Sequence, residues 1–182
     1  MHATATVLLH RFVPSVNPFT EMVSAYLNSS YQWLARLTFV ALGCSIGFLG
    51  LSLALHQIQG VSFVVAEVLL VIAVIGLSGV AVAPDLAASI ARPTQPALVI
   101  AILLLSLVLR HEAEWQAAGP ILLGISFGLI ALFVVTIFFG ALVSAGFGGL
   151  ANRVVLVLIY AWVLLVARGL LVGSEMRITG AA

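Results

Sequence analysis

Long apolar runs separated by short polar stretches occupy most of the chain. Four of the runs cover residues 37–55, 61–83, 120–143 and 154–173. Each is long enough to cross a bilayer as an α-helix, which takes about 20 predominantly apolar residues. The pattern therefore predicts a helical membrane protein.

A fifth apolar run, residues 97–109, is too short to cross a membrane by itself. Pro96 suits the first turn of a helix, the residues after the run favour helix, and Gly119 suits a C-cap. We therefore expect one helix over residues 96–118, whose last two turns leave the membrane. This would put Trp115 at the level of the lipid head groups.

A short amphipathic segment precedes the first span. Its apolar residues Phe19, Met22, Val23, Tyr26 and Leu27 recur at helical spacing. Asn17 suits an N-cap, Pro18 the first helical position, and residues 28–30 a stop. A helix of about 10 residues is predicted here, either lying along the membrane interface or folded back onto the bundle.

The predicted fold class is thus all-α, a polytopic membrane helix bundle with a short interfacial helix before the first span. Residues 1–30 form the N-terminal segment and residues 31–182 a single transmembrane domain. The expected spans are about 35–55, 61–83, 96–116, 120–143 and 153–173.

Composition supports the membrane assignment and narrows the choice of partners. Only 7% of the residues are charged and 63% are hydrophobic, against about 25% and 45–50% in soluble domains. Seven arginines against six acids give a net charge of +1, so there is no electrostatic case for nucleic acid. The lone Cys44 excludes an intrachain disulfide and makes no case for a metal site.

The arginines give a small bias in orientation. With the N-terminus in the cytoplasm, one side carries Arg11, Arg36, Arg92 and Arg153, and the other carries Arg110, Arg168 and Arg177. Because cytoplasmic loops are enriched in basic residues, we expect a multi-pass membrane protein with a cytoplasmic N-terminus.

Small residues recur at spacings that let helix backbones approach closely. They are Gly43, Gly47 and Gly50 in the first span, Gly76 and Gly79 in the second, and Gly124 and Gly128 in the fourth. Two interpretations stay open, packing within the bundle and packing against the helix of a partner subunit.

Three short motifs resemble those of a known family. They are the Ser-x-Tyr element at Ser24 and Tyr26, the loop AVAPDLAAS with Asp85, and the stretch GGLANRVVLVLIYAW with Arg153. Together they resemble the bacterial domain-of-unknown-function family 998 of multi-pass integral membrane proteins, and this resemblance implies a location in the bacterial inner membrane. The resemblance implies a fold and attaches no activity.

Two departures from that family stand out. Its members usually begin with a further membrane helix, so the resemblance implies a chain lacking the family's first helix. Acids expected near Ser24 and Arg153 are replaced by Ala25 and Asn152. Any chemistry that those acids served in relatives would be lost here.

Glu67 is the one acid inside an apolar run. It lies roughly 9 Å from the start of its run, where an ionised carboxylate costs at least about 2.5–3.5 kcal/mol. Arg168 lies roughly 7.5 Å deep on the same side, so we predict a Glu67–Arg168 pair. Alternatively, Arg168 extends to the head groups while Glu67 is protonated or hydrogen-bonded to a hydroxyl.

No catalytic motif accompanies these groups, and we expect neither an enzyme nor a metal site. No cofactor is predicted, although a bound lipid or pigment is compatible with the sequence, with His56 as the candidate pigment ligand.

The favoured function is a non-catalytic accessory or structural subunit of a larger membrane complex, of respiratory or photosynthetic type. Its partners would be lipids and other membrane subunits. The alternative is a small-solute or lipid transporter or binding protein that uses the Glu67–Arg168 pair.

Overall fold

The computed structural model describes residues 9, 11–21, 23–56, 58, 60–138 and 140–180, and these contain helices and no strand. Five helices are long and apolar enough to cross a membrane. They are α2 (Gln32–Leu55), α3 (Val61–Val82), α4 (Ala87–Leu109), α5 (Gly119–Phe133) and α7 (Gly148–Gly180). The all-α fold with five candidate spans is confirmed.

Short elements connect the spans. They are the 3₁₀ helices η1 (Val23–Asn28), η2 (Pro84–Leu86) and η3 (Ala113–Trp115), the π-helical turn η4 (Val134–Phe138), and the single turn α6 (Ala141–Ser144). The helices alternate in direction, so η1, η2, η4 and the start of α7 lie at one end of the bundle. We call this the η1 end, and the opposite end, which contains η3, the η3 end.

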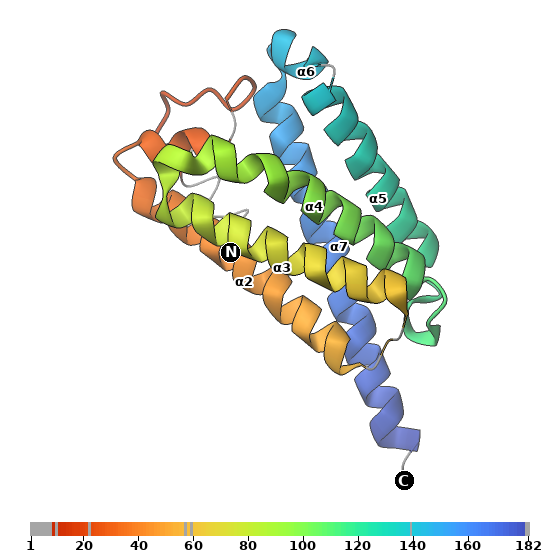
Figure 1. Ribbon diagram of the computed structural model, residues 1–182. Coiled ribbons are helices and arrows are strands. Elements are labelled where there is room, and N and C mark those ends of the chain that lie inside the picture. Colours follow the sequence, from red (N-terminus) through yellow and green to blue (C-terminus); the bar gives the residue numbers. More distant parts are fainter. Residues whose placement is uncertain are drawn as a thin grey trace.

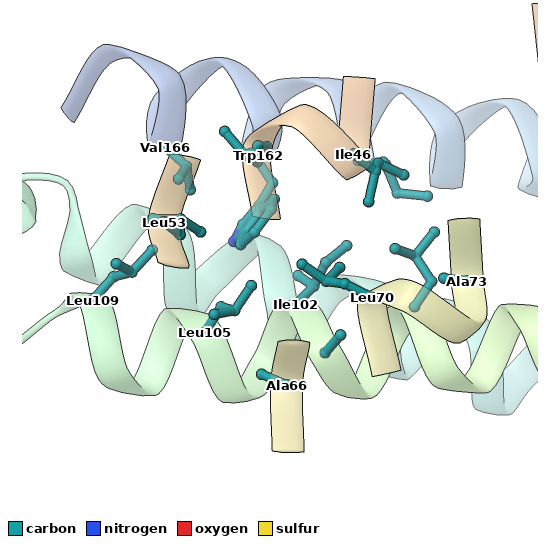
Figure 2. Close-up of a cluster of buried hydrophobic side chains, with 14 of the residues drawn as sticks. Ile46, Leu53, Ala66, Leu70, Ala73, Ile102, Leu105, Leu109, Trp162 and Val166 are labelled. Atoms are coloured by element: carbon teal, nitrogen blue, oxygen red, sulfur yellow. The ribbon is translucent and has the colours of Figure 1, made fainter. Parts of the chain in front are cut away.

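The five long helices close into a ring. Helix α3 packs between α2 and α4, α5 packs between α4 and α7, and α7 returns to contact α2 (Figure 1). One buried apolar cluster fills the ring and draws on all five helices. Figure 2 shows Leu70 of α3 beside Ile102 of α4, and Trp162 of α7 pointing toward Leu105. Since lipid is as apolar as this core, close packing has to stabilise it.

A buried polar network crosses the same core. Trp162 Nε1 donates to Ser106 Oγ at 2.8 Å, and Ser106 Oγ lies 2.8 Å from Ser126 Oγ. Both serine side chains are fully buried. The network ties α7, α4 and α5 together where no water is available to replace the bonds.

The prediction for the third span is wrong at both ends. Instead of residues 96–118, α4 covers Ala87–Leu109 and includes Pro93 and Pro96. Prolines are tolerated inside membrane helices because neighbouring groups satisfy the backbone. The chain leaves the helix after Leu109 because Trp115 turns into the bundle. Its side chain is fully buried, and its Nε1 donates to the Val166 carbonyl at 3.1 Å.

One further expectation fails with it, because Gly119 begins α5 instead of ending α4. The fourth span also ends earlier than predicted. Helix α5 passes into the π-helical turn η4, and Gly140 adopts a positive φ of 56° before α6, a conformation that favours glycine.

The N-terminal helix is shorter and tighter than predicted. The Asn17 side chain accepts a hydrogen bond from the Phe19 amide, and Glu21 accepts one from the Asn17 amide. These two bonds hold a turn that precedes the 3₁₀ helix η1, which ends at Asn28. Val23, Tyr26 and Leu27 are buried, so the segment folds back onto the bundle. Met22 lies outside the described residues.

Candidate functional site

A cavity of about 720 Å³ opens at the η1 end. Its lining comes from η1, η2, α2, α3, α4, α7 and the region where α5 passes into η4. Helices α4 and α5 approach each other near η3 and diverge toward this end (Figure 1). The volume falls within the range of about 300–1,000 Å³ typical of small-molecule sites.

The deep walls of the cavity are apolar. They include Phe39, Leu42, Leu77, Leu98, Leu129 and Ile159. At a rise of 1.5 Å per residue, Leu42 lies about 15 Å along α2 from its start. This is about half of the roughly 30 Å hydrocarbon layer, so the cavity reaches the depth of one lipid leaflet.

The rim of the cavity is polar and charged. Glu21 precedes η1, Asp85 lies in η2 and Arg92 lies in α4, and all three side chains are exposed. None of them forms an ion pair with another described residue. Ser24, Asn28, Gln95 and Asn152 add uncharged polar groups. The rim therefore offers two carboxylates and one guanidinium to a ligand.

A further polar atom lies in the wall itself. Thr136 lines the cavity from η4, and its hydroxyl oxygen is buried without a hydrogen-bond partner among the described residues. π-Helical turns interrupt regular helices and are frequent at functional sites. Thr136 thus supplies a hydroxyl that a ligand in the cavity can use.

The start of α7 holds in place the η1 wall, which is the part of the cavity lining formed by residues 21, 23–25, 27 and 28. Arg153 Nη1 donates to the backbone carbonyls of Pro18 at 2.6 Å and Glu21 at 3.0 Å. The Leu150 amide donates to the Phe19 carbonyl at 3.0 Å. Gly149 permits this approach, since a side chain there would collide with the Pro18 and Glu21 carbonyls.

The four family-like positions gather around this cavity. Ser24 and Asp85 line it. Tyr26 is fully buried beneath η1, and its hydroxyl lies 3.5 Å from Arg153 Nη2. Asn152, where the resemblance leads one to expect an acid, accepts a hydrogen bond from the Val23 amide at 3.1 Å. It thus helps to anchor the wall.

A family comparison covers most of the chain. Residues 2–169 match the family described as "Protein of unknown function (DUF998)". The chain belongs to the DUF998 family. No curated protein and no solved structure matches it.

In this DUF998 protein, the predicted Glu67–Arg168 pair is not formed. Glu67 Oε1 is buried without a hydrogen-bond partner among the described residues, and no ion pair there joins Glu67 to Arg168. The Glu67 carboxylate faces Gly50 of α2, where an added Cβ would lie 3.1 Å from Oε2. Arg168 is exposed on α7. Both residues lie near the η3 end, as their depth predicted, but Glu67 faces α2 while Arg168 is exposed.

His56 belongs to a small cluster at the η3 end. Its Nε2 lies 3.4 Å from Glu114 Oε1, and its ring meets Trp115 edge-on with centroids 5.4 Å apart. Gly169 lies against the Trp115 indole, and Gly173 against Glu114 and His56. These two glycines were not among the predicted packing positions, although the stretch GLLVG has the same GxxxG spacing as Gly43 and Gly47.

The predicted packing glycines lie mostly between helices of this chain. Gly43 and Gly47 lie against Leu77 and Val74 of α3, and Gly50 against Glu67. Gly76 and Gly79 lie against Thr94 and Ile90 of α4, and Gly128 against Leu158 of α7. Gly124 has open space at its Cβ position.

Metal-binding groups do not assemble in the described part of the chain. No three residues among its His, Cys, Asp and Glu lie close enough together to hold an ion. The arrangement of the η1 end is that of a cavity with an apolar interior and a charged rim. Such a cavity can bind an amphipathic molecule.

Proposed function

We propose that this DUF998 protein binds an amphipathic, lipid-like molecule in the cavity at the η1 end. The observation that carries the proposal is the gradient along this one cavity, from Leu129 and Ile159 inside to Glu21, Asp85 and Arg92 at the rim. An acyl chain fits the apolar interior, because burying it there avoids contact with water. A polar head group fits the rim.

Two further features support binding over simple packing. The Thr136 hydroxyl in the cavity wall lacks a partner among the described residues, and buried polar groups are normally hydrogen-bonded. The cavity also ends at the level where a leaflet's chains meet the head groups, if α2 and α7 cross the membrane over their full apolar length. A lipid could therefore occupy it without leaving its leaflet.

Retention of lipid by the purified protein tests the proposal. Val155→Trp on α7 should fill the cavity, because Val155 lines it. Val157→Trp is the matched control, since Val157 is 64% exposed on the same helix. We expect lipid extracted from gel-filtered protein to fall in Val155→Trp and to stay at the wild-type level in Val157→Trp.

Equal lipid retention in both variants would contradict the proposal. Leu132→Trp, which enters the cavity from α5, provides a second blocking variant if Val155→Trp is not monodisperse. Both blocking variants should behave alike.

We propose the accessory-subunit role as a second candidate. Its supporting observation is Gly124, which faces open space on α5 where a partner helix could approach closely. Gentle extraction from the native membrane, followed by identification of co-purifying proteins, tests this role. Recovery of the wild-type chain alone would count against it.

We also infer an inner-membrane location with the η1 end in the cytoplasm. Arg36, Arg92 and Arg153 lie at that end, in accord with the basic bias of cytoplasmic loops. A single cysteine introduced at exposed Ser30, in a Cys44→Ser background, should resist an impermeant thiol reagent in intact cells.

A further inference from the structure

We propose that the cavity selects a zwitterionic lipid whose head group carries a primary ammonium beside a phosphate. This inference rests on the proposed lipid-binding function and names its ligand class. In the proposed geometry, Glu21 and Asp85 receive the ammonium, and Arg92 receives the phosphate.

The balance of charge at the rim favours a zwitterion. Glu21, Asp85 and Arg92 line the cavity with no ion pair to another described residue. A purely anionic head group could use Arg92 but would also meet two carboxylates, and like charges disfavour one another. A head group that carries both signs can satisfy all three side chains.

Arg153 does not change that balance. It lies near the rim, but Nη1 already donates to the carbonyls of Pro18, Glu21 and Gly149, and its Nη2 lies 3.5 Å from the Tyr26 hydroxyl. Its guanidinium is therefore committed to holding the η1 wall. Arg92 remains the cation that lines the cavity.

The chemistry of the rim favours a primary over a quaternary ammonium. A primary ammonium donates up to three hydrogen bonds, and the carboxylates of Glu21 and Asp85 together with the side-chain oxygens of Asn28 and Gln95 can accept them. Quaternary ammonium groups donate none and are typically bound by aromatic cages. The aromatic residues that line this cavity, Phe39 and Phe133, belong to the helices α2 and α5, and neither is in a segment that carries a rim carboxylate.

Glu21 can bind the ligand and keep its hydrogen bond to the Asn17 amide at the same time. Its Oε2 accepts from the Asn17 amide at 2.6 Å, which leaves the other carboxylate oxygen available. The side-chain oxygen of a glutamine can accept the same hydrogen bond from the Asn17 amide. Glu21→Gln should therefore remove the charge and preserve the local structure.

Lipid competition on the full-length protein tests the inference. Delipidated protein is incubated in mixed micelles containing equal amounts of phosphatidylethanolamine, phosphatidylglycerol and phosphatidylcholine, and the retained lipid is identified by mass spectrometry. We expect wild type to favour phosphatidylethanolamine by about fivefold, the factor that corresponds to about 1 kcal/mol from exposed ion pairs.

Rim variants then assign the preference to the side chains. The double variant Glu21→Gln/Asp85→Asn should retain total lipid but lose the preference over phosphatidylglycerol. Arg92→Gln should weaken retention of all three phospholipids. Glu112→Gln is the control, because Glu112 lies at the η3 end, outside the cavity lining, and it should behave like wild type.

The outcomes separate this inference from the proposed function. If wild type retains no more lipid than Val155→Trp, the proposed function itself fails. If wild type retains more lipid than Val155→Trp but shows no head-group preference, or prefers phosphatidylglycerol or phosphatidylcholine, lipid binding stands and the primary-amine inference is overturned. A preference that survives Glu21→Gln/Asp85→Asn overturns it too.

Discussion

Arg153, at the start of the last helix, donates a 2.6 Å hydrogen bond to the backbone carbonyl of Pro18, 135 positions earlier in the sequence. This bond joins the N-terminal segment to α7 and fixes one wall of the cavity. The carbonyl belongs to backbone, so its recognition does not depend on a particular side chain at position 18. It depends on the reach and the several donors of the arginine.

Replacing Arg153 should loosen the N-terminal segment. In Arg153→Lys the charge remains, but one ammonium cannot reproduce the geometry of the planar guanidinium. Since hydrogen bonds to charged groups are worth about 1.5–3 kcal/mol, we expect a fall in melting temperature of about 3–10 °C in detergent. Protease cleavage before α2 should be faster as well. Arg110→Lys is the control at the η3 end, and an equal loss there would argue against a specific role.

Alanine substitutions at two helix glycines, Gly169 and Gly124, should have opposite effects on thermal stability. A methyl group at Gly169 would overlap the Trp115 indole, whereas Gly124 has open space. Overpacking costs about 1–3 kcal/mol, so Gly169→Ala should lower the melting temperature. Gly124→Ala should leave it unchanged or raise it, because alanine is the better helix former by about 1 kcal/mol. Thermal unfolding of the two variants in the same detergent checks this, and a similar response in both would contradict the packing seen here.

The number and type of the spans could be predicted because lipid leaves the backbone few choices. Apolar runs such as that of α3 must be helical to satisfy their own amide and carbonyl groups. The ends of the helices could not be predicted with the same success. Helix α4 ends at Leu109 because Trp115 is held by the Val166 carbonyl, 51 positions later in the sequence, and no local pattern contains that bond.

The candidate site was predicted only in part for a related reason. Motif resemblance selected Ser24, Asp85 and Arg153, which lie around the cavity. The cavity itself arises from the divergence of α4 and α5 and from the π-helical turn at Thr136. Both are tertiary features. For Glu67 and Arg168 the sequence supplied depth, but it did not supply the direction in which each side chain points.

Glu67 and Arg168 should not be coupled energetically. The Glu67 Oε1 atom has no hydrogen-bond partner in the described part of the chain, and Arg168 is exposed. Glu67→Gln and Arg168→Gln should therefore have additive effects on stability, as expected for residues that share no contact. Glu67→Gln alone should be neutral or slightly stabilising, because it removes a carboxylate from an apolar layer. A coupling above about 0.5 kcal/mol in the double-mutant cycle would show that the pair forms in the membrane.

Ser106 and Ser126 of the core network should contribute unequally to thermal stability. Ser106 accepts the hydrogen bond of Trp162 Nε1, whereas Ser126 contacts Ser106 alone in this network. Ser106→Ala leaves a buried indole N–H without its acceptor, which costs about 1–3 kcal/mol. Ser126→Ala leaves that bond intact, because the Ser106 hydroxyl can still donate to the Ile102 carbonyl and accept from Trp162. We therefore expect the melting temperature to fall more in Ser106→Ala than in Ser126→Ala.

The indole fluorescence of Trp162 checks the same bond in a protein in which Trp33 and Trp115 are replaced by phenylalanine. Its emission maximum should shift when Ser106→Ala is added and stay nearly unchanged when Ser126→Ala is added. The reverse order of the two variants would mean that Trp162 has another acceptor.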